Sequence, residues 1–176
     1  MTTVKFIPIA IYTGVLGACV QIIDILIHGF VPPVGNAGLS WIAFLAWATY
    51  FMSGCTVRGG IKAMISMVVG ALLSCAIITL AWVMPFLGVW AVPAAIVCLV
   101  PLTIMLERCP DIVSAVAPVF IGAGAFFGCI NQSPDATLGQ VFAGEAVYCL
   151  IGLFFGWLTI VGRSWYTARV TAAQDA

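Results

Sequence analysis

The chain has 176 residues, of which 64% are hydrophobic and only 7% are charged, and its mean hydropathy is +1.21. A soluble domain usually has about a quarter of its residues charged. The formal net charge is zero, which excludes the basic surface of a nucleic-acid-binding protein. No polar segment is long enough to form a soluble domain. We therefore expect residues 1–176 to form a single polytopic membrane domain, with the lipid bilayer as its main partner.

The sequence contains six apolar runs separated by short breaker segments. The first extends from Phe6 to Gly29 and is too long for the hydrophobic region of a cleaved signal peptide, so we predict a retained span. The second, from Ser40 to Thr56, is close to the lower length limit for crossing the hydrocarbon core. The predicted spans are residues 6–29, 40–56, 61–83, 86–106, 112–130 and 138–162, and residues 163–176 form a short cytoplasmic tail.

The basic residues indicate how these spans are oriented. If the N-terminus is cytoplasmic and the chain crosses six times, every Lys and Arg falls on the cytoplasmic side, and the three opposite loops contain none. The basic residues are Lys5, Arg58, Lys62, Arg108, Arg163 and Arg169. This pattern satisfies the positive-inside rule. The sequence thus predicts an all-α membrane protein of six transmembrane helices with both termini in the cytoplasm.

A weak internal repeat accompanies the six spans. Shifting the chain by 74 residues places Gly54-Cys55 on Gly128-Cys129 and Cys75 on Cys149, so spans two and three echo spans five and six without a gap. Identity is low, and chance matches among abundant small residues are the alternative explanation. Three spans in each half would give the halves opposite orientations, which is the 3+3 inverted-repeat plan of many transporters. A substrate path would then lie between the halves.

Several short motifs resemble a known family. They are Leu39-Ser-Trp-Ile-Ala-Phe-Leu45, Thr49-Tyr-Phe51, Gly59-Gly-Ile-Lys62 and Val119-Phe-Ile-Gly-Ala-Gly-Ala-Phe-Phe-Gly128. Together they resemble domain-of-unknown-function family 1097, the small YcdZ-like bacterial inner-membrane proteins. The resemblance covers most of spans two to six and little of span one. It implies a location in the bacterial inner membrane, and it supplies no activity and no site residues.

Span one carries an unexpected polar stripe. Gln21, Asp24 and His28 lie close to one face of a helix, because positions i, i+3 and i+7 stack. An acid inside a membrane costs a few kcal/mol or more, so the stripe needs a reason. A structural reading pairs Asp24 with His28 or with a neighbouring helix. A functional reading makes the two residues a protonatable pair at the outer mouth of a pathway.

Glu145 is the second acid within a predicted span. Span six enters the membrane from outside, so Glu145 lies about 10 Å from the outer surface at 1.5 Å per residue, a depth similar to that of Asp24. No basic residue within its own span neutralises it. Tyr148 follows at i+3 and would bond Glu145 only across a local bend or from another helix. Glu145 is therefore the main candidate for a solute or ion pathway, with Asp24, His28, Gln21 and Tyr148 as accessories.

Small residues recur at helical spacing. Gly124-xxx-Gly128 and Gly152-xxx-Gly156 let helix backbones approach closely in lipid, so we predict helix packing there, with a subunit interface as the alternative. The seven cysteines form no C-x-x-C pair and no cluster with metal-ligand spacing. They are expected to be packing residues, with a redox or metal role as the alternative. We accordingly expect no metal and no cofactor.

No enzyme signature occurs, since H-E-x-x-H, G-x-S-x-G and P-loop motifs are all absent from the sequence. We therefore do not expect an enzyme. The first hypothesis is a small channel or transporter for a small polar solute, neutral or weakly cationic, with its mouth near Glu145, Asp24 and His28. One small subunit encloses little interior, and cyclic symmetry is common, so a homo-oligomer is expected. The alternative is a non-transporting membrane partner or assembly subunit, a dry bundle in which every polar group is paired.

Overall fold

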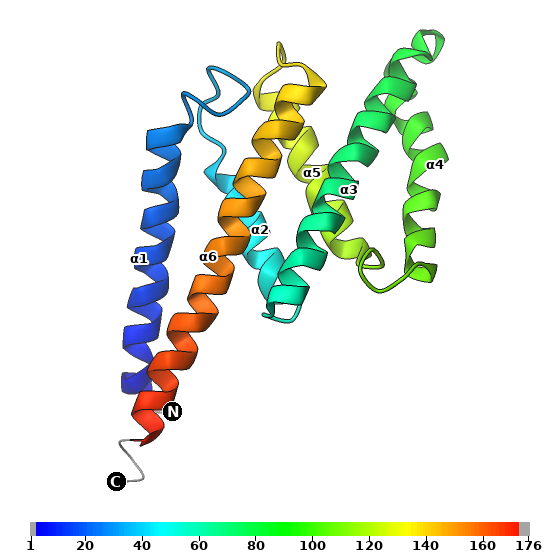
Figure 1. The fold of residues 1–176 in the computed structure, drawn as a ribbon. Coiled ribbons are helices and arrows are strands. Elements are labelled where there is room, and N and C mark those ends of the chain that lie inside the picture. The colour runs from blue at the N-terminus through cyan, green and yellow to red at the C-terminus, as the bar shows by residue number, and fades with distance from the viewer. Residues whose placement is uncertain (1–2, 173–176) are drawn as a thin grey trace.

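The part of the chain that the structure describes, residues 3–172 of a computed structural model, is built from helices (Figure 1). Its elements in chain order are α1 (Thr3–Ile27), α2 (Ser40–Met52), α3 (Val57–Trp82), η1 (Pro85–Trp90), α4 (Ala91–Ile104), η2 (Met105–Arg108), α5 (Val116–Gln132) and α6 (Leu138–Ala172). The elements η1 and η2 are short 3-10 helices that flank α4. The predicted all-α fold class is confirmed.

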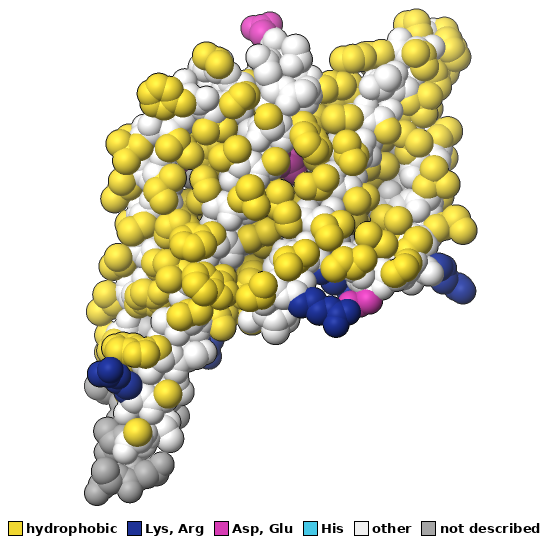
Figure 2. Space-filling view, in the orientation of Figure 1, with side chains coloured by type: hydrophobic (Ala, Val, Ile, Leu, Met, Phe, Trp, Pro, Cys, Tyr) yellow, Lys and Arg dark blue, Asp and Glu magenta, His cyan; other side chains and the backbone are white. Residues whose placement is uncertain are grey.

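Four helical stretches are long and apolar enough to cross a membrane: Phe6–Ile27, Val57–Trp82, Pro85–Arg108 and Leu138–Ala172. The helices α2 and α5 are apolar but have only 13 and 17 residues. A 13-residue helix is about 20 Å long, whereas the hydrocarbon core is ~30 Å thick. Hydrophobic side chains cover the middle of the molecular face in Figure 2. The chain is thus a multi-pass membrane protein whose apolar helices contact lipid.

The junction between α2 and α3 differs from the sequence-based boundaries. The predicted second span runs to Thr56, but α2 ends at Met52 because Gly54 and Cys55 take positive φ values of 91° and 57°. The hydroxyl oxygen of Thr56 then accepts a hydrogen bond from the backbone N–H of Gly59 at 3.0 Å and caps α3. As a result α3 begins at Val57, four residues before the predicted third span at residue 61.

The prolines occupy different places in α4 and α5. Pro93 and Pro118 lie in the first turns of their helices, where a missing N–H leaves no hydrogen bond unmade. Pro101 lies inside α4, which ends three residues later at Ile104. Only Pro101 therefore removes a hydrogen bond from a helix interior in this pair of helices.

The helix α6 is the longest element and continues well beyond the predicted span. Its 35 residues include the predicted span 138–162 and most of the predicted tail, while residues 173–176 lie outside the described part of the chain. It contacts α1, α2, α3 and α5. Along α1, the hydroxyl of Tyr12 donates to the carbonyl of Leu158 at 2.9 Å, and the guanidinium of Arg163 lies 6.0 Å from the ring centre of Phe6.

Two helix pairs form the centre of the bundle. The most extensive contacts join α3 to α5 and α2 to α6, and α3 and α6 also touch each other. In Figure 1, α1 flanks α6 at one end of the molecule and α4 flanks α3 at the other. The main core lies among these helices, and its largest fully buried apolar side chains include Leu39, Ile42, Met67, Phe126 and Val141.

Glycines make both central pairs close. A Cβ built on Gly122 of α5 would lie 2.6 Å from the Cα of Met67 on α3, and one built on Gly70 of α3 would overlap the carbonyl oxygen of Val119. On the other pair, a Cβ on Gly152 of α6 would overlap the carbonyl oxygen of Ala43 on α2. Backbone therefore packs on backbone in both pairs, as in small-residue interfaces of membrane helices.

Substituting Gly122→Ala tests this close contact. The added methyl group would force α3 and α5 apart, so we expect a loss of about 1–3 kcal/mol in the free energy of unfolding, the usual cost of overpacking. Gly124→Ala is the matched control, because a Cβ on Gly124 meets no described atom within 4 Å. Unfolding of both variants in detergent, followed by circular dichroism, gives the comparison. Equal stability of the two would contradict the close approach.

Candidate functional site

The carboxylate of Asp24 joins three helices. It is 3% exposed, and its Oδ1 accepts a hydrogen bond from the backbone N–H of Leu39 at 3.0 Å, directly before α2. The same oxygen accepts from the hydroxyl of Tyr148 on α6. The side-chain amide of Gln21 lies 3.5 Å from Oδ2. Asp24 therefore satisfies the structural reading of the polar stripe, in which it bonds neighbouring elements.

The loop between α1 and α2 is held from within by Asn36. The side-chain nitrogen of Asn36, which is 5% exposed, donates to the carbonyls of His28, Val31 and Pro33 at 2.9, 3.0 and 2.9 Å. Its side-chain oxygen accepts from the N–H of Gly38 at 2.8 Å. Gly38 has φ +97°, and a Cβ there would lie 2.5 Å from Asp24 Oδ2. A glycine at this position thus lets the loop close over the carboxylate.

The side chains of His28 and Gln21 each make a hydrogen bond that does not involve the carboxylate of Asp24. Nδ1 of His28 lies 2.9 Å from the backbone carbonyl of Asp24, and its ring is half-buried at the end of α1. The side-chain oxygen of Gln21 accepts from the hydroxyl of Ser40 at 3.0 Å. Gln21 hence helps to fix the start of α2, while the ring of His28 bonds within α1 and its backbone carbonyl accepts from Asn36 of the loop.

Glu145 is separated from this group. It is 2% exposed, and neither of its carboxyl oxygens has a hydrogen-bond partner among the described residues. Its neighbour on α6, Tyr148, points to Asp24 instead. The side chain of Glu145 borders a cavity of about 10 Å³ between α3 and α6, which is also lined by Met64, Met67, Val68, Ala71, Phe142, Ala146 and Cys149. The expected constellation of two acids at one level therefore divides into a bonded carboxylate and an unbonded one.

A polar hollow of about 320 Å³ lies between the α1–α2 and α5–α6 loops. Gln132, the last residue of α5, lines it and bonds the opposite side, accepting from the indole N–H of Trp41 at 3.3 Å and donating to the carbonyl of Gly38 at 3.4 Å. Asp135 and Gln140 lie on the α5–α6 side. Sequence reasoning missed this hollow because its residues come from two loops about a hundred positions apart, and no spacing rule joins them.

The predicted packing glycines take different positions. Gly152 and Gly156 lie against Ala43 and Tyr50 of α2, and Gly128 lies against the ring of Trp41. Gly124 faces open space in the described structure. The closest α3–α5 contact is made by Gly70 and Gly122, which the small-xxx-small search did not include.

Comparison with known proteins gives one match. The model of a family described as protein of unknown function (DUF1097) matches residues 10–161. The chain belongs to the DUF1097 family. The match begins inside α1, so it includes Asp24 and His28, which the short motifs had left aside. No curated protein matches the chain, and no solved structure matches it.

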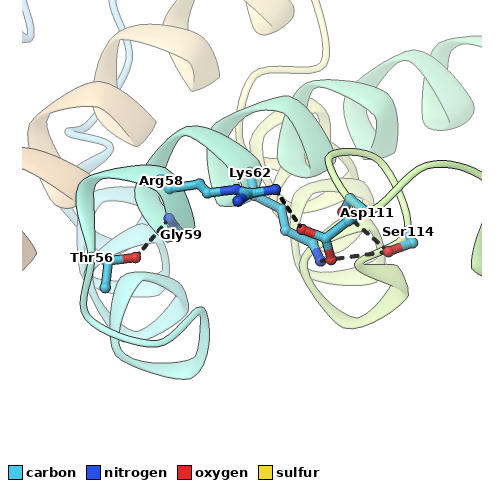
Figure 3. A network of polar contacts seen from close by, with 6 residues as sticks. All are labelled: Thr56, Arg58, Gly59, Lys62, Asp111 and Ser114. Atoms are coloured by element: carbon cyan, nitrogen blue, oxygen red, sulfur yellow. Dashed lines mark hydrogen bonds and ion pairs between the residues drawn. The ribbon is translucent and has the colours of Figure 1, made fainter.

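At the opposite end of this DUF1097 protein, an ion-pair cluster joins α3 to the α4–α5 loop (Figure 3). The ammonium of Lys62 lies 2.7 Å from Oδ1 of Asp111, and the guanidinium of Arg58 lies 3.6 Å from Oδ2. The hydroxyl of Ser114 donates to the carbonyl of Asp111 at 3.1 Å. The hydrogen bond from Lys62, aided by the charges of Lys62 and Arg58, holds the pKa of Asp111 below its usual value of 3.8.

A double-mutant cycle on Asp24→Ala and Tyr148→Phe tests the buried junction. Each change leaves a buried partner unsatisfied, so each is expected to lower the free energy of unfolding by about 1–3 kcal/mol. Because the two side chains share one hydrogen bond, the double variant should lose less than the sum. Gln21→Ala, which removes the long contact to the same carboxylate and an exposed hydrogen bond from Ser40, is the control and should change little. Additive losses would show that the two side chains are not coupled.

The lowered pKa of Asp111 sets a direction for the pH dependence of stability. An ionised carboxylate stabilised in the folded state adds stability above its usual pKa, and this contribution disappears as the pH falls through the lowered value. The melting temperature of Asp111→Asn should therefore lie below that of the wild type near neutral pH, and the two should converge in acid below pH 3.8. Glu107→Gln is the control, since Glu107 makes no ion pair among the described residues. A gap that persists unchanged in acid would be inconsistent with this ion pair.

Proposed function

We propose that this protein is a transporter of the bacterial inner membrane that moves a small polar solute, neutral or weakly cationic, past Glu145. The observation that carries the proposal is the carboxyl of Glu145, buried on α6 with no hydrogen-bond partner among the described residues. A buried acid without a partner is unfavourable unless it carries a proton or meets a cation. The other buried acid, Asp24, does have partners, because its carboxylate bonds the start of α2 and Tyr148 of α6.

The proposed topology is six spans with both termini cytoplasmic. Figure 2 supports it, because Lys and Arg side chains lie along the lower edge of the visible face, where Figure 1 places the α2–α3 and α4–α5 loops. The short helix α2 is extended by chain that enters the bundle, since Leu39 and Asn36 are both buried. The side chain of Lys5 lies outside the described side chains.

A 3+3 inverted repeat is supported by the way the helices pair. In such a repeat, α1, α2 and α3 correspond to α4, α5 and α6. The α2–α6 contact then corresponds to the α5–α3 contact, and the α1–α6 contact corresponds to the α4–α3 contact. All four contacts are present. Equivalent helices begin at Ser40 and Val116, and at Val57 and Leu138, so the proposed register differs from the gapless shift of 74 residues. In this arrangement α3 and α6 contact each other on the repeat axis, and Glu145 lies at their contact.

Three hollows follow one another along α6. Gln140 lines the polar hollow between the loops, Glu145 lines the small cavity, and Leu150 to Trp157 line an apolar groove of about 460 Å³ against α3. Met64 lines both the small cavity and the groove. The cavity itself is too small for an open aqueous path, which favours a closed state of a transporter over an open channel. A homo-oligomer remains part of the proposal on the ground of subunit size.

The groove between α3 and α6 favours a second candidate function. Its lining, which includes Val57, Ile61, Phe154 and Trp157, is apolar and exposed, so it suits a helix of another membrane protein. A non-transporting partner protein would use this surface and keep its polar groups paired, as Asp24 and Asn36 are. The unpaired carboxyl of Glu145 is the feature that such a dry bundle does not explain.

Flux into liposomes tests transport directly. Small amides, amines, weak acids and monovalent cations would be compared in liposomes holding the wild type, Glu145→Gln or no protein. We expect at least one solute to enter faster with the wild type, and Glu145→Gln to slow it about tenfold or more, which corresponds to ~1.4 kcal/mol in the barrier.

Glu107→Gln, a change at an exposed acid at the end of the Pro85–Arg108 stretch, serves as the matched control and should leave the flux unaltered. If no solute enters faster than in protein-free liposomes, or if Glu145→Gln transports as well as the wild type, the proposal fails. The partner-protein function would then take its place.

A further inference from the structure

Three of the residues that line the small cavity at Glu145 contain sulfur. Met64 and Met67 stand one turn apart on α3 and border it from one side. Cys149 stands one turn after Glu145 on α6 and borders it from the other. Two methionines, one cysteine and Glu145 thus line the same small space. Glu145 is 2% exposed, and its carboxyl oxygens have no hydrogen-bond partner among the described residues.

We propose that this cavity is a binding site for a soft monovalent metal ion of the Cu(I) or Ag(I) class. Met64, Met67 and Cys149 would supply sulfur ligands, and the carboxylate of Glu145 would take up the proton of the thiol. Binding at this site stands on the cavity alone, whereas the statement that the bound ion is the transported cation rests on the proposed function.

The donor set selects the kind of ion. Thioether and thiol ligands prefer soft ions such as Cu(I), whereas Ca²⁺ and Mg²⁺ require about six or more oxygen ligands, including water. The cavity offers a single carboxyl and apolar side chains besides the sulfur atoms. Hard cations would therefore keep most of their charge uncompensated there.

The size of the cavity excludes larger cations. Its volume of about 10 Å³ is close to the minimum of ~10–15 Å³ that one water molecule occupies by the same kind of measure. A single ion fits such a space, while an amine with a carbon skeleton or an amide does not. Among weakly charged solutes, this favours a monatomic ion.

Charge balance favours a monovalent ion. The Cys149 thiol loses its proton when it binds M⁺, and the carboxylate of Glu145 can take up that proton. The thiolate, the ion, the neutral thioethers and the protonated carboxyl then form a neutral site, which is the inexpensive state in an apolar interior. A divalent ion would leave a net positive charge there. The ion enters and leaves in the same oxidation state, so binding involves no electron transfer.

The sequence does not reveal this site because its donors lie on two helices and half of them are methionines. Among the described residues, no group of three or more His, Cys, Asp or Glu side chains lies close enough to hold a metal. A search confined to those residue types overlooks thioether ligands. The absence of metal-ligand spacing in the sequence is therefore compatible with a site formed across the α3–α6 contact.

Binding is tested on purified full-length protein in detergent. Under reducing conditions, the protein would be loaded with Cu(I), exposed to a competing Cu(I) chelator that strips isolated thiols, and analysed for retained copper. We expect one retained ion per chain, with X-ray absorption showing sulfur neighbours from thioethers as well as thiol. The double variant Met64→Leu with Met67→Leu should weaken binding about tenfold or more. Losing a residue that only supports a metal ligand already lowers metal affinity about 10–100-fold, and here two ligands are lost.

The controls replace a methionine and a cysteine that lie outside the cavity. Met105→Leu and Cys98→Ala change exposed residues of the fourth span and should retain the ion as the wild type does. Because leucine is close to methionine in volume, the double variant is expected to fold. Cys149→Ser is a second variant that should also weaken binding, should the double variant fail to fold.

Each outcome has a definite consequence. Retention that is equal in the wild type and in the variants of Met64, Met67 and Cys149 overturns the proposal, as does a wild type that loses all copper to the chelator. Binding without Ag(I) or Cu(I) flux into liposomes supports the site and counts against its role in transport. Flux of an organic solute that depends on Glu145, with no metal binding, overturns this inference and leaves the proposed function standing.

Discussion

The hydrogen bonds of the Asp24 carboxylate decide how the first third of the chain meets the rest. One oxygen accepts from the backbone of Leu39 and from Tyr148, so a single side chain of α1 fixes the start of α2 and the middle of α6. In a membrane interior no water replaces these donors, which makes their alignment a strict requirement on the loop. The four hydrogen bonds of Asn36 and the positive φ of Gly38 meet that requirement. The loop is then buried on its inner side, at Pro33, Asn36 and Gly38, while Phe30 and Val34 stay exposed.

The centre of the bundle depends on a different constraint, the absence of side chains. Gly70 and Gly122 bring α3 onto α5, while Gly152 brings α6 onto α2, and little space is left where α3 and α6 meet. Glu145 lies at that meeting without a hydrogen-bond partner among the described residues. The contrast between Asp24 and Glu145 is informative, because the same kind of side chain is fully used for structure in one place and left free in the other. Structural need therefore accounts for the first acid and not for the second.

Hydropathy and breakers predicted the order of the helices because burial in lipid leaves a strong signal in composition. The α2–α3 boundary was less predictable, because α3 is capped by Thr56 and includes Gly59 and Gly60 in its first turn. The partner of Tyr148 could not be predicted either, because Asp24 is 124 positions away in α1, where no local spacing rule applies. Gly122 was missed because a close contact depends on which face meets a neighbour, and a pattern within one helix does not contain that information. Burial of Glu145 followed from its place in an apolar run, but its lack of a partner required the packed structure.

The length of α6 has a mechanical consequence. From Glu145 to Ala172 the helix continues unbroken, a distance of about 40 Å at 1.5 Å per residue. Its last turns leave the bundle, and there Arg169 lies 4.5 Å from the ring centre of Trp165 on the same helix. Because α1 stays packed along α6 as far as Arg163, a tilt of α6 by a few degrees near Glu145 would carry α1 with it and become a displacement of several ångströms at the exposed tip. The C-terminal end of α6 is thus the place on this molecule where small rearrangements deep in the membrane are amplified into motion on the aqueous side.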